Sequence, residues 1–226
     1  MVNNLPTERL KKNTSDPSSK KWKIRHYLKP GDVGYLTYLH GILYSKEYGY
    51  DQTFEAYVAN GLVEFVQNFS PDKDRIWLAE INNQIIGSIA IVKASKHEAQ
   101  LRWFLVHPNH RGLGLGRELI KATLQFCKEH GYKTIFLWTT SELNVARYLY
   151  LSAGFRKTEE KTHQIWGKTI TEERYDLHLR KAGTLEGANE QVEAEKTMSS
   201  KRKERIHAIR QKLDWLYCKP SWRIRG

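Results

Sequence analysis

The sequence of 226 residues contains only two cysteines, Cys127 and Cys218, and no long apolar run. Two cysteines cannot build a disulfide framework or a cysteine-ligated zinc site, and they suit a reducing compartment. No stretch approaches the roughly 18 apolar residues that span a membrane, and the first residues lack the apolar core of a secretory signal. We therefore expect a cytoplasmic, globular protein that makes no membrane contact and holds no metal ion.

Positive charge is concentrated at the two ends of the chain. Of the formal net charge of +12, residues 1–26 carry +5 and residues 181–226 carry +5, which leaves +2 for residues 27–180. Basic ends can contact nucleic acid by neutralising phosphates, although such ends are more often simply solvated. Any nucleic-acid contact is therefore expected through the ends alone.

Composition along the chain predicts one domain with an extension on each side. Residues 1–22 are polar and basic and are predicted to be disordered, and the domain is predicted over residues 23–180. Residues 181–198 are predicted to form a linker, and residues 199–226 a basic tail with an amphipathic helix. That helix needs a partner surface, which could be this domain, a second copy in a homodimer, or another protein. Its apolar positions are Ile206, Ile209, Leu213 and Leu216.

The hydrophobic pattern predicts two helices, then antiparallel strands, then strands that alternate with helices. The predicted helices cover residues 33–47, 53–69, 114–130 and 142–152. The predicted strands cover residues 22–27, 75–81, 84–92, 98–106, 134–140, 156–166 and 174–179. Asn82 and Asn83 are predicted to form a hairpin turn, because asparagine tolerates a positive φ. This order indicates an α/β fold in which helices flank a mixed central sheet.

The most informative segment is an apolar strand that runs into a glycine-rich turn at the start of a helix, over residues 101–120. Glycine lets the backbone approach a ligand closely, and the free amides of a helix start favour an anion. Arg111 and Arg117 add positive charge, so we expect a diphosphate ligand. The spacing fits neither a P-loop, which needs Lys-Ser/Thr after the last glycine, nor G-x-G-x-x-G. The glycines of the turn are Gly112, Gly114 and Gly116.

The pattern R-x-x-G-x-G over residues 111–116 resembles the pyrophosphate-binding motif of GNAT N-acetyltransferases. A second segment resembles the family's later motif, in which a helix ends in Tyr-x-x-x-Gly-Phe, here Tyr150, Gly154 and Phe155. The resemblance covers residues 23–180 and is strongest to acetyltransferase domains fused to MarR-type regulators. We expect the residues before it to be too few to fold a regulator. The resemblance implies the GNAT acyl-CoA N-acyltransferase fold.

The resemblance also implies an activity, the direct transfer of an acetyl group from acetyl-CoA to a primary amine of a small molecule or protein. The Val106 amide would serve the thioester oxygen, and Tyr150 would face the sulfur as a proton donor. Asn144 would contact the pantetheine arm or cap its helix. The implied cofactor-binding residues are Leu105, Val106, Arg111, Gly112, Leu113, Gly114, Leu115, Gly116, Arg117 and Asn144.

The group that deprotonates the amine is less defined by the sequence. Family members with a carboxylate base carry it on the strand before the glycines, where this chain has Gln100. Glu98, on the same strand face, and Glu80 are the candidate bases, beside a water-mediated route. The candidate substrate-binding residues are His40, Tyr44 and Glu55.

Two alternatives from other functional classes accompany the enzyme. One is a catalytically silent domain of the same fold that binds CoA or a partner protein. The other is a nucleic-acid-associated protein whose basic ends dominate its interactions. The glycine-rich turn and Tyr150 favour the enzyme over the first, and the nearly neutral centre of the chain disfavours the second.

Overall fold

The computed structural model describes residues 22–179 of the chain. The predictions for residues 1–21 and 180–226, including the linker and the tail helix, lie outside the described residues. None of the helices within the described part is long and apolar enough to cross a membrane.

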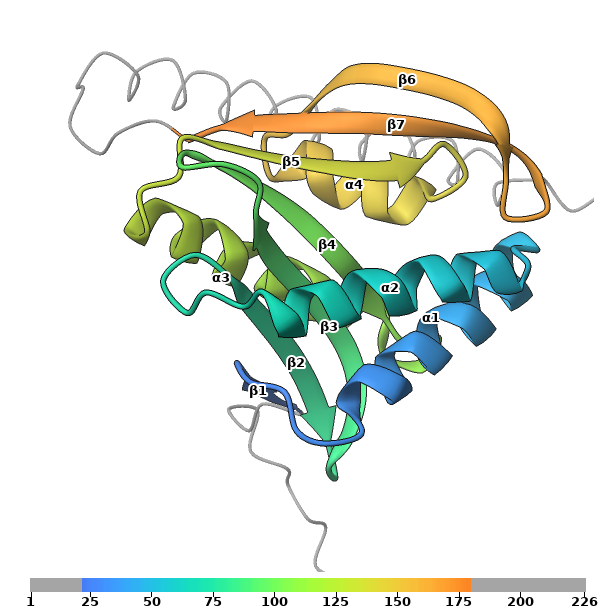
Figure 1. Ribbon diagram of the computed structural model, residues 1–226, viewed down its shortest axis with the longest axis horizontal. Coiled ribbons are helices and arrows are strands. Elements are labelled where there is room, and N and C mark those ends of the chain that lie inside the picture. The colour runs from blue at the N-terminus through green and yellow to red at the C-terminus, as the bar shows by residue number, and fades with distance from the viewer. Residues whose placement is uncertain (1–21, 180–226) are drawn as a thin grey trace, which may run out of the picture. The chain divides into compact units, whose positions relative to one another are not determined.

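A seven-stranded sheet forms the centre of the fold, in the order β1-β2-β3-β4-β5-β7-β6 (Figure 1). Its only parallel pair is β4 with β5, so the predicted mixed sheet is confirmed. The strands are β1 (Lys23–Arg25), β2 (Arg75–Ile81), β3 (Gln84–Lys93), β4 (Glu98–Val106), β5 (Thr134–Thr140), β6 (Arg156–Ile165) and β7 (Lys168–His178). The helices are α1 (Asp32–Tyr48), α2 (Gln52–Gln67), α3 (Leu115–Glu129) and α4 (Asn144–Ser152), with a 3-10 turn at Pro108–His110.

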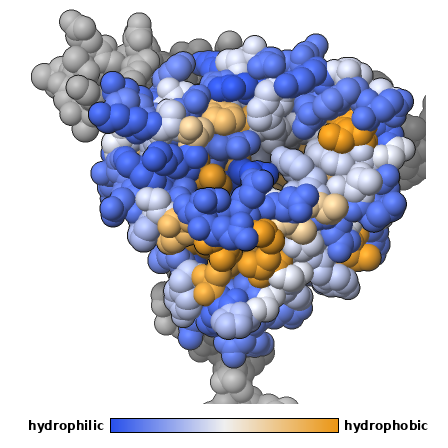
Figure 2. Space-filling model, viewed as in Figure 1, coloured by the Kyte–Doolittle hydropathy of each residue, from blue (hydrophilic) through white to orange (hydrophobic). Residues whose placement is uncertain are grey.

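The sheet separates two hydrophobic clusters, one on each face. Leu36 of α1 and Leu62 of α2 are fully buried against β2, β3 and β4 on the first face. Leu119 of α3 and Tyr150 of α4 pack on the second face. Figure 2 shows apolar side chains gathered over α1 and α2 on an otherwise mainly hydrophilic surface. The exposed apolar residues here include Ile42 of α1, Val63 and Val66 of α2, and Phe69, which follows the end of α2.

The turn between β2 and β3 agrees with the sequence prediction, whereas the first residues of β7 and α4 differ from it. Asn82 and Asn83 have φ values of 50° and 63°, which confirms the predicted hairpin turn between β2 and β3. Strand β7 begins at Lys168 instead of residue 174, because its first residues pair with β6 in a long hairpin that β5 joins at Glu172. Helix α4 begins at Asn144 instead of residue 142. The side chain of Glu142 instead accepts a hydrogen bond from Lys168 Nζ at 2.6 Å.

Strands β4 and β5 separate soon after they meet. Their parallel pairing covers only three residue pairs, and it ends where Gln100 lies beside Phe136. Beyond that point β4 continues to pair with β3, and β5 continues to pair with β7. The two strands therefore diverge and leave a gap that opens toward the carboxyl end of β4.

A β-bulge in β4 changes which side chains face the helices α1 and α2. Ala90 pairs with Arg102 but Ser88 pairs with Leu105, so β4 has one residue more than β3 in this interval. Trp103 takes a φ of 48°, and the Ser88 hydroxyl donates to its carbonyl oxygen at 2.7 Å. Since side chains otherwise alternate along a strand, the extra residue puts both Arg102 and Trp103 on the side of α2.

The turn between β6 and β7 is fastened to the start of α2. Asp51 caps α2 by accepting a hydrogen bond from the Thr53 amide at 2.9 Å, and its own amide donates to the Trp166 carbonyl at 3.1 Å. Gly167 has a φ of +81°, and a Cβ there would lie 2.8 Å from Asp51 Oδ2. The contact positions Trp166 against α2.

We expect Gly167→Ala to destabilise the fold by about 1–3 kcal/mol more than Gly131→Ala. Both glycines have a positive φ, but no atom lies within 4 Å of a Cβ built on Gly131, so that variant suffers only the backbone strain. Urea denaturation of the two variants measures the difference. Equal losses would contradict a tight contact between Gly167 and Asp51.

Candidate functional site

The glycine-rich turn joins the end of β4 to the start of α3, and its glycines serve two purposes. Gly112 and Gly114 adopt left-handed conformations, with φ values of +78° and +92°, and nothing lies within 4 Å of a Cβ at either position. Gly116 lies inside α3, where a Cβ would come 3.1 Å from Leu149 Cδ1 of α4. The first two glycines therefore allow the turn, and the third allows α3 to pack closely against α4.

The start of α3 can hold an anion. Its N-cap, Gly114, provides no side-chain cap, and the hydrogen bond from the Glu118 amide to the Gly114 carbonyl closes the first turn. The amides of residues 115–117 therefore have no acceptor within the helix. Such amides, together with the helix dipole, favour a phosphate group at this position.

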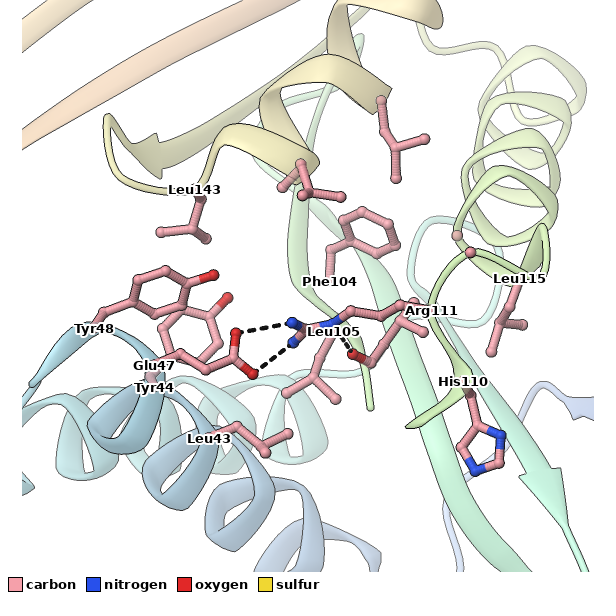
Figure 3. A pocket seen from close by; sticks show the side chains of 16 residues that line it. Leu43, Tyr44, Glu47, Tyr48, Phe104, Leu105, His110, Arg111, Leu115 and Leu143 are labelled. Atoms are coloured by element: carbon pink, nitrogen blue, oxygen red, sulfur yellow. Dashed lines mark hydrogen bonds and ion pairs between the residues drawn. The ribbon is translucent and has the colours of Figure 1, made fainter. Parts of the chain in front are cut away.

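A cleft of about 770 Å³ opens beside this turn (Figure 3). Its walls come from the second half of α1, the end of β4, the glycine-rich turn and the first residues of α3 and α4. We call it the turn cleft. The predicted cofactor residues that line it are Leu105, Val106, Arg111, Gly112, Leu115 and Gly116.

The other predicted cofactor residues do not line the turn cleft. Leu113 and Gly114 belong to the turn but are exposed, and Arg117 points along the outer surface of α3, where it lines a separate groove. Asn144 is also exposed, and its side-chain oxygen accepts a hydrogen bond from Arg147 in the same helix. The amide nitrogen of Asn144 and the second lone pair of its oxygen remain available for a pantetheine contact.

Arg111 reaches across the turn cleft to α1. Its Nη1 and Nη2 atoms each donate to one carboxylate oxygen of Glu47 at 2.9 Å, and its Nε donates to the Val106 carbonyl at 2.9 Å (Figure 3). The Arg111 and Glu47 side chains are 41% and 21% exposed, so water screens the pair and limits its contribution to about 1 kcal/mol or less. Arg111 thus lies beside the turn, and its charge is balanced by Glu47 of α1.

A second cleft, of about 700 Å³, lies between α1, α2, the diverging strands β4 and β5, and the β6–β7 hairpin. We call it the aromatic cleft, because Phe, Tyr and Trp side chains form most of its wall. The rings of Tyr44, Tyr50, Phe54, Tyr57 and Trp166 contact one another with centroid distances between 4.6 and 6.4 Å. The aromatic residues that line it are Tyr44, Tyr50, Phe54, Tyr57, Trp103, Phe104, Trp138, Tyr150 and Trp166.

The two clefts adjoin each other. Tyr44, Phe104 and Leu143 line both, so a molecule in one cleft can approach a molecule in the other. Tyr150 lines the aromatic cleft, with its ring centroid 5.8 Å from that of Phe104. Burial raises the pKa of the Tyr150 phenol, and its hydroxyl has no hydrogen-bond partner among the described residues. The phenol therefore stays protonated and remains available as a donor.

His40 offers the aromatic cleft an acceptor. Its side chain is 2% exposed, and its Nδ1 lies 2.8 Å from the Leu36 carbonyl, which can only accept, so Nδ1 carries the proton. Burial lowers the pKa of His40 to about 4, so the ring is neutral at physiological pH. Its Nε2 atom is buried and has no hydrogen-bond partner in the described structure. A lone pair is thus left for a ligand or for water.

Three carboxylates that the sequence suggested are not brought to either cleft. Glu98 pairs with Arg174 at 3.2 Å, and Glu80 pairs with Arg25 at 2.7 Å on a distant edge of the sheet. Glu55 is exposed and lies over Gly41 of α1, where a Cβ would meet its Oε2 at 2.5 Å. These positions disfavour Glu98 and Glu80 as the base and Glu55 as a substrate-binding residue, and those roles stay predictions.

Sequence reasoning missed the carboxylate that does line the aromatic cleft, Glu172. It lies on the first half of β7, which the sequence placed outside a strand, and its Oε2 is 2.7 Å from Nε2 of His163. Gln100 lines the same cleft, as its strand position predicts. Within residues 22–179, no group of three His, Cys, Asp or Glu side chains is arranged to hold a metal ion.

Comparisons with known proteins agree with this geometry. Residues 37–155 match the acetyltransferase (GNAT) family. N-acetyltransferase 8F1 of Rattus norvegicus is 29% identical over 119 residues, which cover 49% of this chain and 54% of that protein. The chain spans about half the length of the curated relatives that it matches.

Solved structures of low sequence identity share the fold. A GNAT family acetyltransferase from Elizabethkingia anophelis with acetyl-CoA bound has a TM-score of 0.51 and 16% identity, over 71% of this chain and 100% of that one. A spermidine N-acetyltransferase from Vibrio cholerae, in complex with CoA and spermine, has a TM-score of 0.55 and 20% identity, over 71% and 97% of the two chains.

The reassignment of Glu80 to a structural role can be tested by Glu80→Gln. Glu80 and Arg25 have side chains that are 13% and 8% exposed, so removing the negative charge should lower the free energy of unfolding by about 1–3 kcal/mol. The control is Glu159→Gln, in an exposed pair with Lys161. That variant should stay within about 0.5 kcal/mol of wild type. Equal stabilities of the two variants in urea denaturation would contradict a structural role for Glu80.

Proposed function

This chain belongs to the acetyltransferase (GNAT) family, and on that premise we propose that it transfers an acetyl group directly from acetyl-CoA to a primary amine. The observation that carries the proposal is the meeting of the turn cleft and the aromatic cleft at Tyr44, Phe104 and Leu143. Direct transfer needs both substrates to be held next to each other in a reactive orientation. Two adjoining clefts of different chemistry satisfy this need.

The turn cleft has the features that CoA requires. The free amides at the start of α3 suit its diphosphate, and the end of β4 can run beside the pantetheine arm. The His107 amide donates to Ile86 of β3, so by strand alternation the Val106 amide points away from β3 and into the gap left by β5. This amide is well placed to stabilise the negative charge that develops on the thioester oxygen. Acetyl-CoA would supply the activated acetyl group.

Three side chains receive roles in the proposed transfer. Tyr150 donates a hydrogen bond to the leaving thiolate, since its raised pKa keeps the phenol neutral. Glu172 replaces Glu98 and Glu80 as the proposed acceptor of the amine's proton, because it lines the aromatic cleft. His40 is neutral at physiological pH and keeps the lone pair of Nε2 free, so it is assigned the role of a hydrogen-bond acceptor.

Several expectations stay predictions. They are the cytoplasmic location, the homodimer, contact of the basic ends with nucleic acid, and the particular likeness to acetyltransferase domains fused to MarR-type regulators. The rat relative and the bacterial structures support the broader family assignment.

The proposed function is tested by incubating the protein with acetyl-CoA and a panel of primary amines. We expect release of free thiol together with an acetylated amine that mass spectrometry identifies. If the protein binds CoA but acetylates none of the amines, the silent binding module is favoured over the enzyme.

We expect Glu47→Gln to tighten CoA binding by about two- to fivefold. The substitution frees Arg111 for the diphosphate and removes a negative charge from the turn cleft, and an exposed ion pair is worth up to about 1 kcal/mol. Calorimetric titration with CoA measures the change. Glu55→Gln, an exposed carboxylate outside the cleft, is the matched control and should leave the affinity unaltered. Weaker binding by Glu47→Gln would show that the ion pair belongs to the CoA-binding conformation.

We expect Tyr150→Phe to lower turnover by about ten- to a thousandfold while the CoA affinity stays within about threefold. The hydroxyl has no partner among the described residues, so its removal leaves no orphaned group and the melting temperature should hardly change. Single-turnover kinetics, titration and thermal unfolding of the same preparation separate these effects. Wild-type turnover in a stable variant would remove Tyr150 from the mechanism.

A further inference from the structure

Arg102 carries a charge that no acidic residue in the described structure balances. It lines the aromatic cleft, and its guanidinium lies 5.6 Å from the ring centroid of Tyr57 and 4.7 Å from that of Trp103. Its recorded hydrogen bond runs from Nη2 to the Tyr57 hydroxyl at 3.3 Å. A guanidinium has five N–H donors, so most of the donors of Arg102 remain available to a ligand.

The lack of an acidic partner distinguishes Arg102 from the arginines that hold the fold together. Arg25, Arg111 and Arg174 each pair with a carboxylate at 3.2 Å or less. Arg102 is also the only Lys or Arg among the described residues that line the aromatic cleft. The two rings beside it hold the guanidinium in place without neutralising its charge.

Trp103 also lines the aromatic cleft, and its indole carries a donor without a partner in residues 22–179. Its side chain is 7% exposed, and its indole Nε1 is buried with no hydrogen-bond partner in the described structure. An indole nitrogen only donates, so only an acceptor atom can satisfy it. Leaving such a donor unpaired costs about 1–3 kcal/mol, which a bound acceptor would recover.

The β-bulge explains why two neighbouring residues point into one cleft. Regular alternation would send Trp103 to the opposite face of the sheet from Arg102. The bulge instead holds Trp103 at a φ of 48°, a conformation that is unfavourable for a bulky residue, and Ser88 fixes it through its carbonyl. Backbone strain of this kind tends to be kept where it positions functional groups.

The unpaired hydrogen-bonding groups of the aromatic cleft indicate which chemical groups a bound molecule must carry. Arg102 keeps donors beyond the one that it gives to Tyr57, Trp103 Nε1 has no acceptor, and His40 Nε2 has no donor among the described residues. The remaining wall is mainly aromatic. A fitting molecule therefore carries an anionic, oxygen-rich group, an N–H group and a large apolar body.

We propose that the acceptor is an amino acid with a bulky apolar side chain, and that Arg102 binds its carboxylate. The proposal rests on the proposed acetyl transfer and names the substrate class of the aromatic cleft. A guanidinium binds a carboxylate through two parallel hydrogen bonds, and the aromatic wall receives the side chain. A polyamine, in contrast, would bring only positive charges toward Arg102.

Matched pairs of amines that differ only in the carboxylate test this selectivity. The acceptors are phenylalanine against phenethylamine, and tryptophan against tryptamine, with spermidine as the polyamine. We expect kcat/KM for each amino acid to exceed that of its decarboxylated partner by about ten- to a hundredfold. Equal values, or a preference for phenethylamine or spermidine, would overturn the proposal.

Variants of Arg102 test whether this side chain causes the preference for an acceptor with a carboxylate. Arg102→Gln should raise KM for phenylalanine about ten- to a hundredfold and change the rate with phenethylamine by less than about threefold. Arg102→Lys keeps the charge but loses the planar fork, so its effect should be intermediate. Arg75→Gln, an arginine that lines neither cleft, is the matched control. Equal losses with both acceptors would reduce Arg102 to a structural role.

Binding measurements separate this proposal from the acetyl transfer itself. Phenylalanine and phenethylamine are titrated into the CoA-bound protein and its Arg102→Gln variant, followed by saturation-transfer NMR. Binding of phenylalanine that depends on Arg102, without any acetyl transfer, would refute the enzyme and keep the carboxylate site. Transfer to phenethylamine without measurable binding of phenylalanine would refute the carboxylate site and keep the enzyme.

Discussion

Both clefts depend on one constraint in the sheet, the short parallel pairing of β4 with β5. Each of these strands keeps a full partner on its other side, so the gap that opens after Gln100 does not unravel the sheet. Backbone groups of β4 that would pair with β5 are left facing the gap. Aromatic side chains, among them Phe104 and Tyr150, line the space in place of backbone hydrogen bonds. The gap thus provides polar backbone and apolar walls within one site.

Charge is balanced differently on the two sides of this gap. In the turn cleft, Arg111 is held by Glu47, so the empty cleft does not present a free cation at this position. In the aromatic cleft, the charge of Arg102 is held between rings and stays unbalanced. An ion pair that must open reduces the affinity of a site, whereas a preorganised free charge directs specificity. Arg111 therefore suits a cosubstrate that is the same for every acceptor. Arg102 suits an acceptor that the site must select.

Much of the fold and of the cofactor motif could be predicted from local sequence patterns. Hydrophobic periodicity gave the order of the helices and strands, and Asn82–Asn83 marked a turn by its tolerance of positive φ. The polar first half of β7 escaped prediction, because its pairing with β6, joined by β5 from Glu172 onward, compensates for a weak apolar pattern. That omission also hid Glu172, which made Glu98 and Glu80 seem better placed than they are.

The sequence by itself determined the family, the glycine-rich turn and the position of Tyr150, because each depends on residues that are close together along the chain. Only the tertiary structure decided which charged side chains reach the clefts. Glu47 and Arg111 form an ion pair although they are 64 positions apart in the sequence. Glu80 and Glu98 form ion pairs with arginines of other strands. The bulge that joins Arg102 to Trp103 arises from the register between β3 and β4. Partners of this kind are selected by packing and strand register, which local propensity does not encode.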